Sequence, residues 1–215
     1  YVEHIIFRNE ENGYTVLNLS MKGRELTCVG TLPMIGEGEL IEASGDYIEH
    51  AAYGKQFRIE SYETKVPQDS VALERYLGSG AIKGVGAALA ARIVRRFGDD
   101  TLRIIEEEPE RLAEVKGISE RKAREIAQQV AEKAEMQNAM IFLSGYGIAL
   151  NLGAKIYQQY GDNVYRILKE NPYKMAEDIA GVGFRTADEI AGKIGIAVDS
   201  EFRIKSGLSY VLNQA

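Results

Sequence analysis

Residues 81–93 read Ala-Ile-Lys-Gly-Val-Gly-Ala-Ala-Leu-Ala-Ala-Arg-Ile, and the order glycine, apolar residue, small residue inside this stretch returns three more times. We number the copies motifs one to four; they occupy residues 84–86, 117–119, 147–149 and 181–183. Four residues after the end of each copy stands a small residue, and seven residues after it an isoleucine: Ala90, Ala123, Gly153 and Ala187, then Ile93, Ile126, Ile156 and Ile190. One structural unit is therefore repeated along the chain.

The spacing in each copy predicts two helices joined by a tight turn. Glycine adopts the left-handed conformation without steric cost, so we expect the first residue of each motif to end the preceding helix. The apolar second residue is expected to turn inward, and the small residue and the isoleucine continue one buried stripe on the next helix. Such a turn exposes the N-terminal end of that helix, where unpaired N–H groups favour phosphate oxygens. The pattern is typical of the helix-hairpin-helix motif of DNA-binding proteins.

The motifs lie inside a longer repeat with a period of 63 residues. Under this shift residues 97–105 align with 160–168, and Pro109 aligns with Pro172. We therefore expect a tandem duplication of residues near 78–136 and 141–196, each copy with two hairpins. A helical bundle that needs glycine only for tight turns, and binds nothing, is the alternative.

Basic residues are concentrated around motifs one and two, although the whole chain has a formal net charge of −6. Residues 1–66 hold six basic and eleven acidic residues, whereas residues 67–215 hold 20 and 21. We predict phosphate contacts from the turns and the cations that flank them: Lys83, Gly84, Val85, Gly86, Lys116, Gly117, Ser119, Arg121, Lys122, Gly181, Gly183 and Arg185. Such contacts position a protein without reading sequence, so binding should be sequence-tolerant and fall steeply with salt. A solvated helix face is the alternative for each cation.

Motifs one and four are the strongest candidates, since both keep glycine at their third position. Ser119 and Ala149 take that position in motifs two and three, and degenerate copies often serve as packing partners. We expect motif two to add basic side chains, and the DNA contacts of both middle motifs stay open.

Residues 1–66 alternate apolar and polar side chains as β-strands do. We expect strands around residues 4–7, 15–19, 27–30, 40–43 and 56–60, with turns at residues 12–13, 22–23 and 53–54. Five short strands of this kind suit a small closed barrel of the oligonucleotide-binding (OB) type. Tyr14, Tyr53 and Phe57 are candidates for base stacking, and filling the barrel is the alternative role for them.

The predicted fold class is α+β with several domains. A small N-terminal OB-like β-barrel at 1–66 and a linker at 67–72 precede an all-α array of four helix-hairpin-helix motifs, in tandem pairs at 73–138 and 139–199. Residues 200–215 are expected to start a helix that leads to further domains, since the chain opens in mid-strand without methionine and ends in a helical pattern. Ser70 is expected to cap the first helix.

Several chemistries have no signal in this sequence. The Gly-x4-Gly-Lys-Ser/Thr phosphate loop of ATPases is absent. Two histidines and the single Cys28 argue against a zinc site, and a lone thiol fits a reducing cytosol. We find no signal peptide and no apolar run long enough to span a membrane. We therefore expect no catalytic site, metal or cofactor in this segment, and a cytoplasmic location.

Several stretches resemble the N-terminal region of RecD-like ATP-dependent DNA helicases of the YrrC type, also described as exodeoxyribonuclease V alpha-subunit homologues. They include Glu-Arg-Tyr-Leu-Gly-Ser-Gly-Ala-Ile-Lys-Gly-Val-Gly at 74–86, Gly-Val-Gly-Phe-Arg-Thr-Ala-Asp at 181–188, and residues 95–102, 170–173 and 207–213. The resemblance covers essentially the whole chain. It implies a parent enzyme of DNA repair or recombination that moves 5′ to 3′ on single-stranded DNA, with ATP and Mg²⁺ held by motor domains beyond residue 215. Single-stranded or forked DNA and those motor domains are the implied partners.

Three other functions stay open at this point. A junction-binding architectural protein resembling RuvA also joins a barrel to two hairpins, although four hairpins and the lack of a flexible acidic linker argue against it. A helix-hairpin-helix glycosylase or lyase would need a Lys or Asp just past a hairpin, for which Lys193 and Asp188 are the candidates. A protein-docking scaffold would bind a partner independently of salt and would not bind DNA.

Overall fold

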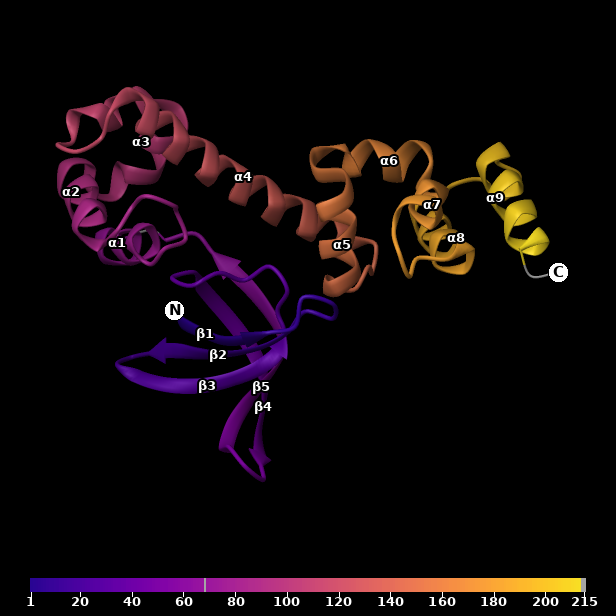
Figure 1. Cartoon of the computed structure of the whole chain (residues 1–215), viewed down its shortest axis with the longest axis horizontal. Helices are drawn as coiled ribbons and strands as arrows, with labels where there is room; N and C mark the ends of the chain where they lie inside the picture. Colours follow the sequence, from indigo (N-terminus) through magenta and orange to yellow (C-terminus); the bar gives the residue numbers. More distant parts are fainter. Residues whose placement is uncertain (68, 214–215) are drawn as a thin grey trace. The chain divides into compact units, whose positions relative to one another are not determined.

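Figure 1 shows the computed structural model, which describes residues 1–67 and 69–213. The chain divides into two compact units, Tyr1–Ala134 and Glu135–Ala215, named here the first and the second unit. The first unit contains a five-stranded sheet and motifs one and two, and the second unit contains motifs three and four. The domain boundaries expected at residues 66, 72, 138 and 199 stay predictions.

The alternation of apolar and polar residues near the N-terminus produces the five expected strands, each longer than the sequence indicates. They are β1 (Val2–Arg8), β2 (Tyr14–Met21), β3 (Arg24–Thr31), β4 (Leu40–His50) and β5 (Gly54–Lys65). Their order in the sheet is β1-β2-β3-β5-β4, with a short parallel pairing of β3 with β5 and antiparallel pairing elsewhere. Lys22 and Gly23, with φ of 50° and 78°, form a two-residue turn between β2 and β3, as a type I′ hairpin requires.

The two edges of this sheet approach each other at one point. The amide of Val2 donates to the carbonyl of Glu39 at 2.9 Å, and the amide of Gly38 donates to the carbonyl of Val2 at 2.7 Å. Within residues 1–67 and 69–213 no strand ladder joins β1 to β4, so the closed barrel expected for residues 1–66 stays a prediction. The side chains buried inside the curled sheet are Val2, Leu17, Cys28, Leu32, Ile35 and Ile59.

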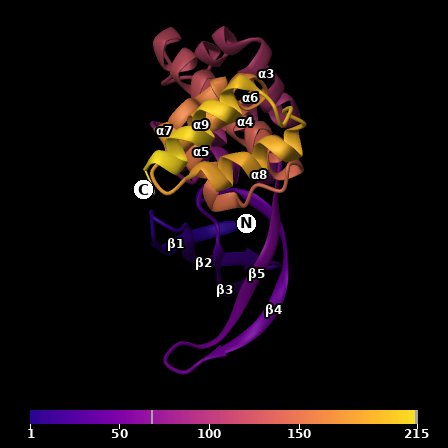
Figure 2. The ribbon, with the colours of Figure 1, turned by 90° about the vertical axis from the view of Figure 1, so that its right-hand side faces the viewer.

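Strands β4 and β5 form a long ribbon (Figure 2). Its register shifts between Ser44 and Gly45, and a Cβ added at Gly45 would overlap the carbonyl oxygen of Arg58. Only glycine lets the two backbones approach this closely, which is a common use of glycine at a β-bulge.

The helical part of the first unit packs around one apolar core. Its elements are α1 (Ser70–Gly78), α2 (Ala87–Phe97), the 3₁₀ helix η1 (Gly98–Asp100), α3 (Thr101–Glu107), the 3₁₀ helix η2 (Pro109–Glu114) and α4 (Glu120–Gly145) as far as Ala134, the rest of α4 belonging to the second unit. Leu77, Ile93, Ile105 and Ile126 are fully buried in this core, each from a different helix. The isoleucines of motifs one and two therefore lie where their spacing places them.

The first helix begins one residue earlier than expected. The carboxylate of Asp69 accepts a hydrogen bond from the amide of Ala72 at 2.8 Å and caps α1. The prediction that Ser70 is the cap was wrong, because Asp69 has the extended backbone of a cap while Ser70 is already helical.

Polar contacts join the sheet of the first unit to its helices. Lys133 on α4 forms an ion pair with Glu39 at 3.1 Å, and only 6% of the Glu39 side chain is exposed. The hydroxyl of Ser79 donates to the carbonyl of Glu37 at 2.9 Å. These contacts fix the segment before β4 against α1 and α4.

The second unit repeats the order of elements seen in the first. The bounds of α5 (Leu150–Tyr160), η3 (Gly161–Asn163) and α6 (Val164–Glu170) are those of α2, η1 and α3 shifted by 63 residues. They are followed by η4 (Pro172–Lys174), α7 (Met175–Asp178), α8 (Phe184–Ile194) and α9 (Glu201–Leu212). Leu143, Ile156, Leu168 and Ile190 lie in its core.

Helix α9 is held against α8 by an ion pair and an aromatic stack. Arg203 donates from Nε and Nη2 to the carboxylate of Asp188 at 2.7 and 3.0 Å, and the hydroxyl of Tyr173 donates to the same carboxylate at 2.7 Å. Phe184 stacks on Tyr210 with ring centroids 5.5 Å apart. The Arg203 guanidinium lowers the pKa of Asp188, so the carboxylate stays charged in this contact.

Candidate nucleic-acid interface

Motifs one, two and four form the same turn. In motif one the amide of Val85 donates to the carbonyl of Ile82 at 3.1 Å, and Gly84 between them has φ of 82°. The amides of Ile118 and Val182 make equivalent bonds at 3.1 and 3.0 Å, around Gly117 (φ 100°) and Gly181 (φ 85°). A hydrogen bond from the amide of the fourth residue to the carbonyl of the first, with a left-handed third residue, is the pattern of a type II turn. Such a turn requires glycine at its third position.

Motif three is built differently. Helix α4 continues to Gly145, and Gly147 follows with φ of 68°. The amide of Ile148 donates to the carbonyl of Leu143 at 3.2 Å, and the amide of Gly147 donates to the carbonyl of Ser144 at 2.8 Å. This is a Schellman cap, in which glycine ends a helix. The expectation of a helix-ending glycine is thus correct for motif three and wrong for the other three, whose glycine lies in a turn after the helix has ended.

The apolar second residue of every motif is buried, as the spacing predicts. Val85, Ile118, Ile148 and Val182 are all at most 6% exposed. The small residues four positions after each motif are buried as well, which lets the helices cross closely. The turn backbone of each motif therefore has a fixed position on its own core.

The four helix starts differ in how their free N–H groups are used. Gly86 and Gly183 precede α2 and α8 with extended backbone, and no side chain caps either helix. In motif two, Ser119 Oγ accepts from the amide of Lys122 at 3.2 Å and so occupies one donor at the start of α4. In motif three the side chain of Asn151 accepts from the amide of Leu152 at 2.8 Å. The helix starts at motifs one and four are thus the two whose first-turn donors meet no capping side chain.

Four cations gather at motifs one and two without an acidic partner. They are Lys83, Arg92, Lys116 and Lys122, and none of them makes an ion pair within the part of the chain that the structure describes. A Cβ added at Gly84 would lie 3.7 Å from Lys122 Cε, and one added at Gly117 would lie 3.6 Å from Arg92 Nη1. Of the predicted site residues in the first unit, Arg121 alone is paired, with Glu125 at 2.7 Å.

Motif four carries fewer charges. Arg185 is exposed at the start of α8, and a Cβ added at Gly181 or Gly183 would meet no atom within 4 Å. Phe184, the first residue of α8, stacks between Tyr173 and Tyr210, with centroid distances of 6.0 and 5.5 Å. The turn of motif four is therefore open to a ligand, and the first side chain of the helix that follows it is held in an aromatic stack.

The amide side chain of Gln129 on α4 forms hydrogen bonds with the backbone of the turn of motif one. Its Oε1 accepts from the amide of Lys83 at 2.8 Å, and its Nε2 donates to the carbonyl of Lys83 at 3.3 Å. The sequence reasoning missed Gln129, since it lies 46 residues from Lys83. Its place one turn after Ile126, on the helix that follows motif two, is the signal that could have indicated it.

Replacing Gln129 with alanine is expected to loosen this turn without unfolding the unit. Loss of these two exposed hydrogen bonds, and of a third from Nε2 to the carbonyl of Glu125, should lower the free energy of unfolding by about 1 kcal/mol. Hydrogen exchange of the Lys83 amide should accelerate at the same time. Gln128→Ala is the matched control, because Gln128 lies on the same helix and its side chain bonds to Glu132 at 2.8 Å and not to Lys83. Equal exchange rates at Lys83 in both variants would contradict the assigned role.

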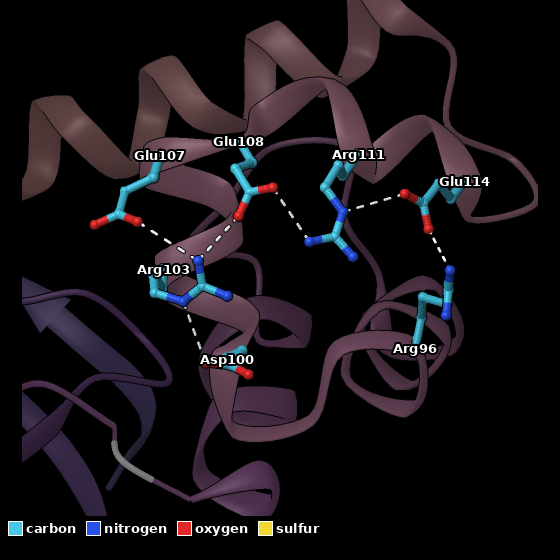
Figure 3. A network of polar contacts seen from close by, with 7 residues as sticks. All are labelled: Arg96, Asp100, Arg103, Glu107, Glu108, Arg111 and Glu114. Atoms are coloured by element: carbon cyan, nitrogen blue, oxygen red, sulfur yellow. Dashed lines mark hydrogen bonds and ion pairs between the residues drawn. The ribbon is translucent and has the colours of Figure 1, made fainter.

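A network of alternating charges connects the end of α2 with η1, α3 and η2 (Figure 3). Arg111 bridges Glu108 and Glu114, at 3.2 Å in each case, and Arg103 bridges Asp100, Glu107 and Glu108. Arg96 pairs with Glu114, so the Arg96 side chain is not available to an anion in this arrangement. Three arginines and four carboxylates leave this face without a positive excess.

Acid is expected to weaken the first unit through this network. Hydrogen bonds from Arg103 and Arg96 hold the pKa of Glu108 and of Glu114 below the ordinary value of 4.5. A carboxylate with a lowered pKa stabilises the fold above that ordinary value and ceases to do so as the pH falls through its folded-state pKa. The urea midpoint should therefore drop as the pH falls below about 4.5, and Arg111→Gln should flatten that drop. An unchanged slope in this variant would argue against the network.

The aromatic candidates lie on separate segments. Tyr14 opens β2 and is 42% exposed, whereas Tyr53 lies in the turn between β4 and β5 and is 77% exposed. Phe57 in β5 is half-buried against the sheet core and makes an edge contact with Tyr47 at 5.2 Å. Within the described residues no ring contact joins any two of these three, so their role in base stacking stays a prediction.

The side chains with possible catalytic chemistry are paired or buried within the fold. Asp188 and Lys193, which the glycosylase alternative needs, have the ion-pair partners Arg203 and Glu189. Cys28 is buried, and its burial raises the pKa of the thiol to about 11. In the described ranges, no three His, Cys, Asp or Glu side chains are grouped so that they could hold a metal ion. None of the helices in those ranges has the length and apolar character of a membrane span.

Comparisons with known proteins match both parts of the chain. The family model described as the OB-fold domain of the ATP-dependent DNA helicase YrrC matches residues 1–67. The family model described as the HHH (helix-hairpin-helix) domain of the ATP-dependent RecD2 DNA helicase matches residues 81–131 and 132–215. The chain is also 25% identical, over 224 residues, to the ATP-dependent RecD2 DNA helicase of Deinococcus radiodurans. That alignment covers 100% of this chain and 31% of the relative, so the chain spans about a third of that protein's length.

Proposed function

The chain belongs to the family of ATP-dependent RecD2 DNA helicases, and we propose that it forms a DNA-binding accessory region of such an enzyme, which holds phosphates through motifs one, two and four. The observation that carries the proposal is the set of cations at motifs one and two that make no ion pair in the described part of a chain whose net charge is −6. An acidic protein that keeps four cations without partners at two glycine turns has an arrangement suited to an anionic ligand.

The geometry supports backbone contacts beside the charge contacts. Gly86 and Gly183 have no Cβ, and the first-turn N–H groups of α2 and α8 have no side-chain cap. A phosphate oxygen can therefore come within hydrogen-bond distance of these donors, where the partial positive charge of the helix end favours it. None of these groups reads a base edge, so the proposed binding is independent of sequence.

The parent activity is part of the same proposal. ATP and Mg²⁺ would be held by motor domains outside residues 1–215, since this sequence has no Gly-x4-Gly-Lys-Ser/Thr loop. The DNA would be single-stranded or forked and the movement 5′ to 3′, with the glycine motifs holding the strand or the duplex near the fork while the motor pulls. No residue of this segment would take part in the hydrolysis.

Fluorescence anisotropy with labelled single-stranded, duplex and forked DNA across a salt series tests this proposal. We expect a steep loss of affinity with salt, with a slope of about −0.9 per phosphate contact on duplex and about −0.7 on single strands. Lys83→Ala with Lys116→Ala should make the duplex slope shallower by about 1.8. Lys169→Ala is the control, because it removes an exposed cation of α6 that has no ion pair in the described ranges.

The other outcomes identify the alternatives. No binding of any DNA at low salt would overturn the proposal and favour a protein-docking scaffold. A preference for four-way junctions, together with an oligomer in light scattering, would favour the RuvA-like architectural role instead. A slope unchanged by the two lysine substitutions would place the DNA contact elsewhere on the chain.

A further inference from the structure

In the first unit, each helix that follows a glycine turn carries a cation onto the other turn. Arg92 lies on α2, which starts at motif one, yet its guanidinium lies against Gly117 of motif two. Lys122 lies on α4, which starts at motif two, yet its side chain lies against Gly84 of motif one. The two cations are thus exchanged between the motifs.

Both side chains are available for a ligand. Arg92 Nε donates to the carbonyl of Ala88 at 3.2 Å, which fixes the guanidinium while its two terminal nitrogens lie nearest to Gly117. Arg92 is exposed and Lys122 half-buried, and neither has an ion-pair partner in the described ranges. A fixed guanidinium presents two parallel donors to a phosphate, whereas a lysine acts as a point charge.

The glycines leave open the space that these cations border. Gly84 and Gly117 have φ of 82° and 100°, which other residues adopt only with strain, and a side chain on either would stand beside the exchanged cation. Lys83 and Lys116 immediately precede them in the turns. Each turn therefore has one cation from its own motif and one from the other.

We propose that the first unit binds two phosphates at composite sites, one made by Lys83 and Lys122 around Gly84, the other by Lys116 and Arg92 around Gly117. The inference rests on the proposed function and deepens it. Neither motif completes a phosphate site alone, so both are engaged together. Arg92 is a binding residue of motif two, although the sequence places it in the helix of motif one.

The second unit does not repeat this exchange. Under the 63-residue shift Arg92 aligns with Lys155, but a Cβ added at Gly181 would meet no atom within 4 Å. Lys193 does lie near Gly147, at 3.4 Å from an added Cβ, but it is paired with Glu189 at 3.1 Å. The composite sites therefore distinguish the helical part of the first unit from the second unit.

Double-mutant cycles on the whole chain of 215 residues test the exchange, with duplex DNA anisotropy as the readout. Arg92→Ala and Lys116→Ala, which share a composite site, should be non-additive by about threefold or more in Kd. Arg92→Ala with Lys83→Ala, which share a motif but not a site, should be additive within about twofold. Each single variant should make the salt slope shallower by about 0.9. Arg92→Lys should keep the slope but bind more weakly than the unsubstituted chain.

The reverse pattern, with Arg92 coupled to Lys83 and independent of Lys116, would overturn the exchange while leaving the proposed function standing. Loss of all DNA binding by the unsubstituted chain would overturn both. Circular dichroism of each variant separates these outcomes from unfolding, and the exposed position of Arg92 makes a folded variant the expected result.

Discussion

Replacing Gly86 with aspartate is expected to weaken DNA binding and to stabilise the protein at the same time. Gly86 has φ of −90° and ψ of 172°, which any residue adopts, and an added Cβ meets no atom within 4 Å. The new carboxylate would cap the free N–H groups of α2 and reduce the freedom of the unfolded chain, for a gain of about 0.5–1 kcal/mol. The same carboxylate would occupy the donors proposed for phosphate and repel it, at a cost of roughly tenfold or more in Kd.

The opposite signs of the two effects make this test decisive. Thermal unfolding measures the gain, and anisotropy with duplex DNA measures the loss. Gly86→Asn supplies a cap without the charge, so it should bind DNA between the glycine and the aspartate forms. An aspartate variant that is more stable and binds DNA as tightly as the unsubstituted chain would remove motif one from the interface.

Removal of the Lys133 side chain is expected to destabilise the first unit by about 3 kcal/mol. Lys133 reaches Glu39 at 3.1 Å, and the Glu39 side chain is 6% exposed. Lys133→Ala would leave a buried carboxylate without its partner, which costs far more than the pair contributes when intact. Urea unfolding of the variant and of the unsubstituted chain measures the loss.

A double variant separates the cost of a stranded charge from the contribution of the pair. Glu39→Gln with Lys133→Met replaces both charges by neutral groups of similar shape, so it should recover most of the lost stability. If this double variant is as unstable as Lys133→Ala, the loss comes from packing and not from the unpaired carboxylate. The exposed cation Lys22, in the turn after β2, provides the alanine control.

Local patterns predicted the positions of the motif residues well. Val85 and Ile126 are buried because helical periodicity fixes the inward face of a helix before its partner is known. The five strands follow in the same way from alternation. The OB-fold and helix-hairpin-helix assignments are confirmed by the family models, and the predicted DNA-binding residues stay predictions.

The type of turn could not be predicted from the same residues. A left-handed glycine serves both a helix cap and a type II turn, so Gly84 and Gly147 have equivalent sequence contexts and different structures. Asp69 and Ser70 are both good caps, and the sequence does not rank them. The Arg92 side chain lies against Gly117, which belongs to another motif. Helical periodicity predicts which face of a helix is buried, but not which neighbouring turn an exposed side chain reaches.

One helix carries the side chains that serve three different places. Lys122, Gln129 and Lys133 of α4 lie at Gly84, at Lys83 and at Glu39, and with about 100° of rotation per residue all three project from one side. The position of these three residues around the axis of α4 therefore decides whether the three contacts form. The identity of the outward-facing residues matters less. One residue inserted between positions 122 and 133 would rotate the following residues of α4 by about 100° around the helix axis. Lys133 would then no longer point toward Glu39, and the ion pair would be lost. We therefore expect this stretch to tolerate substitutions on its outward side but no change of length.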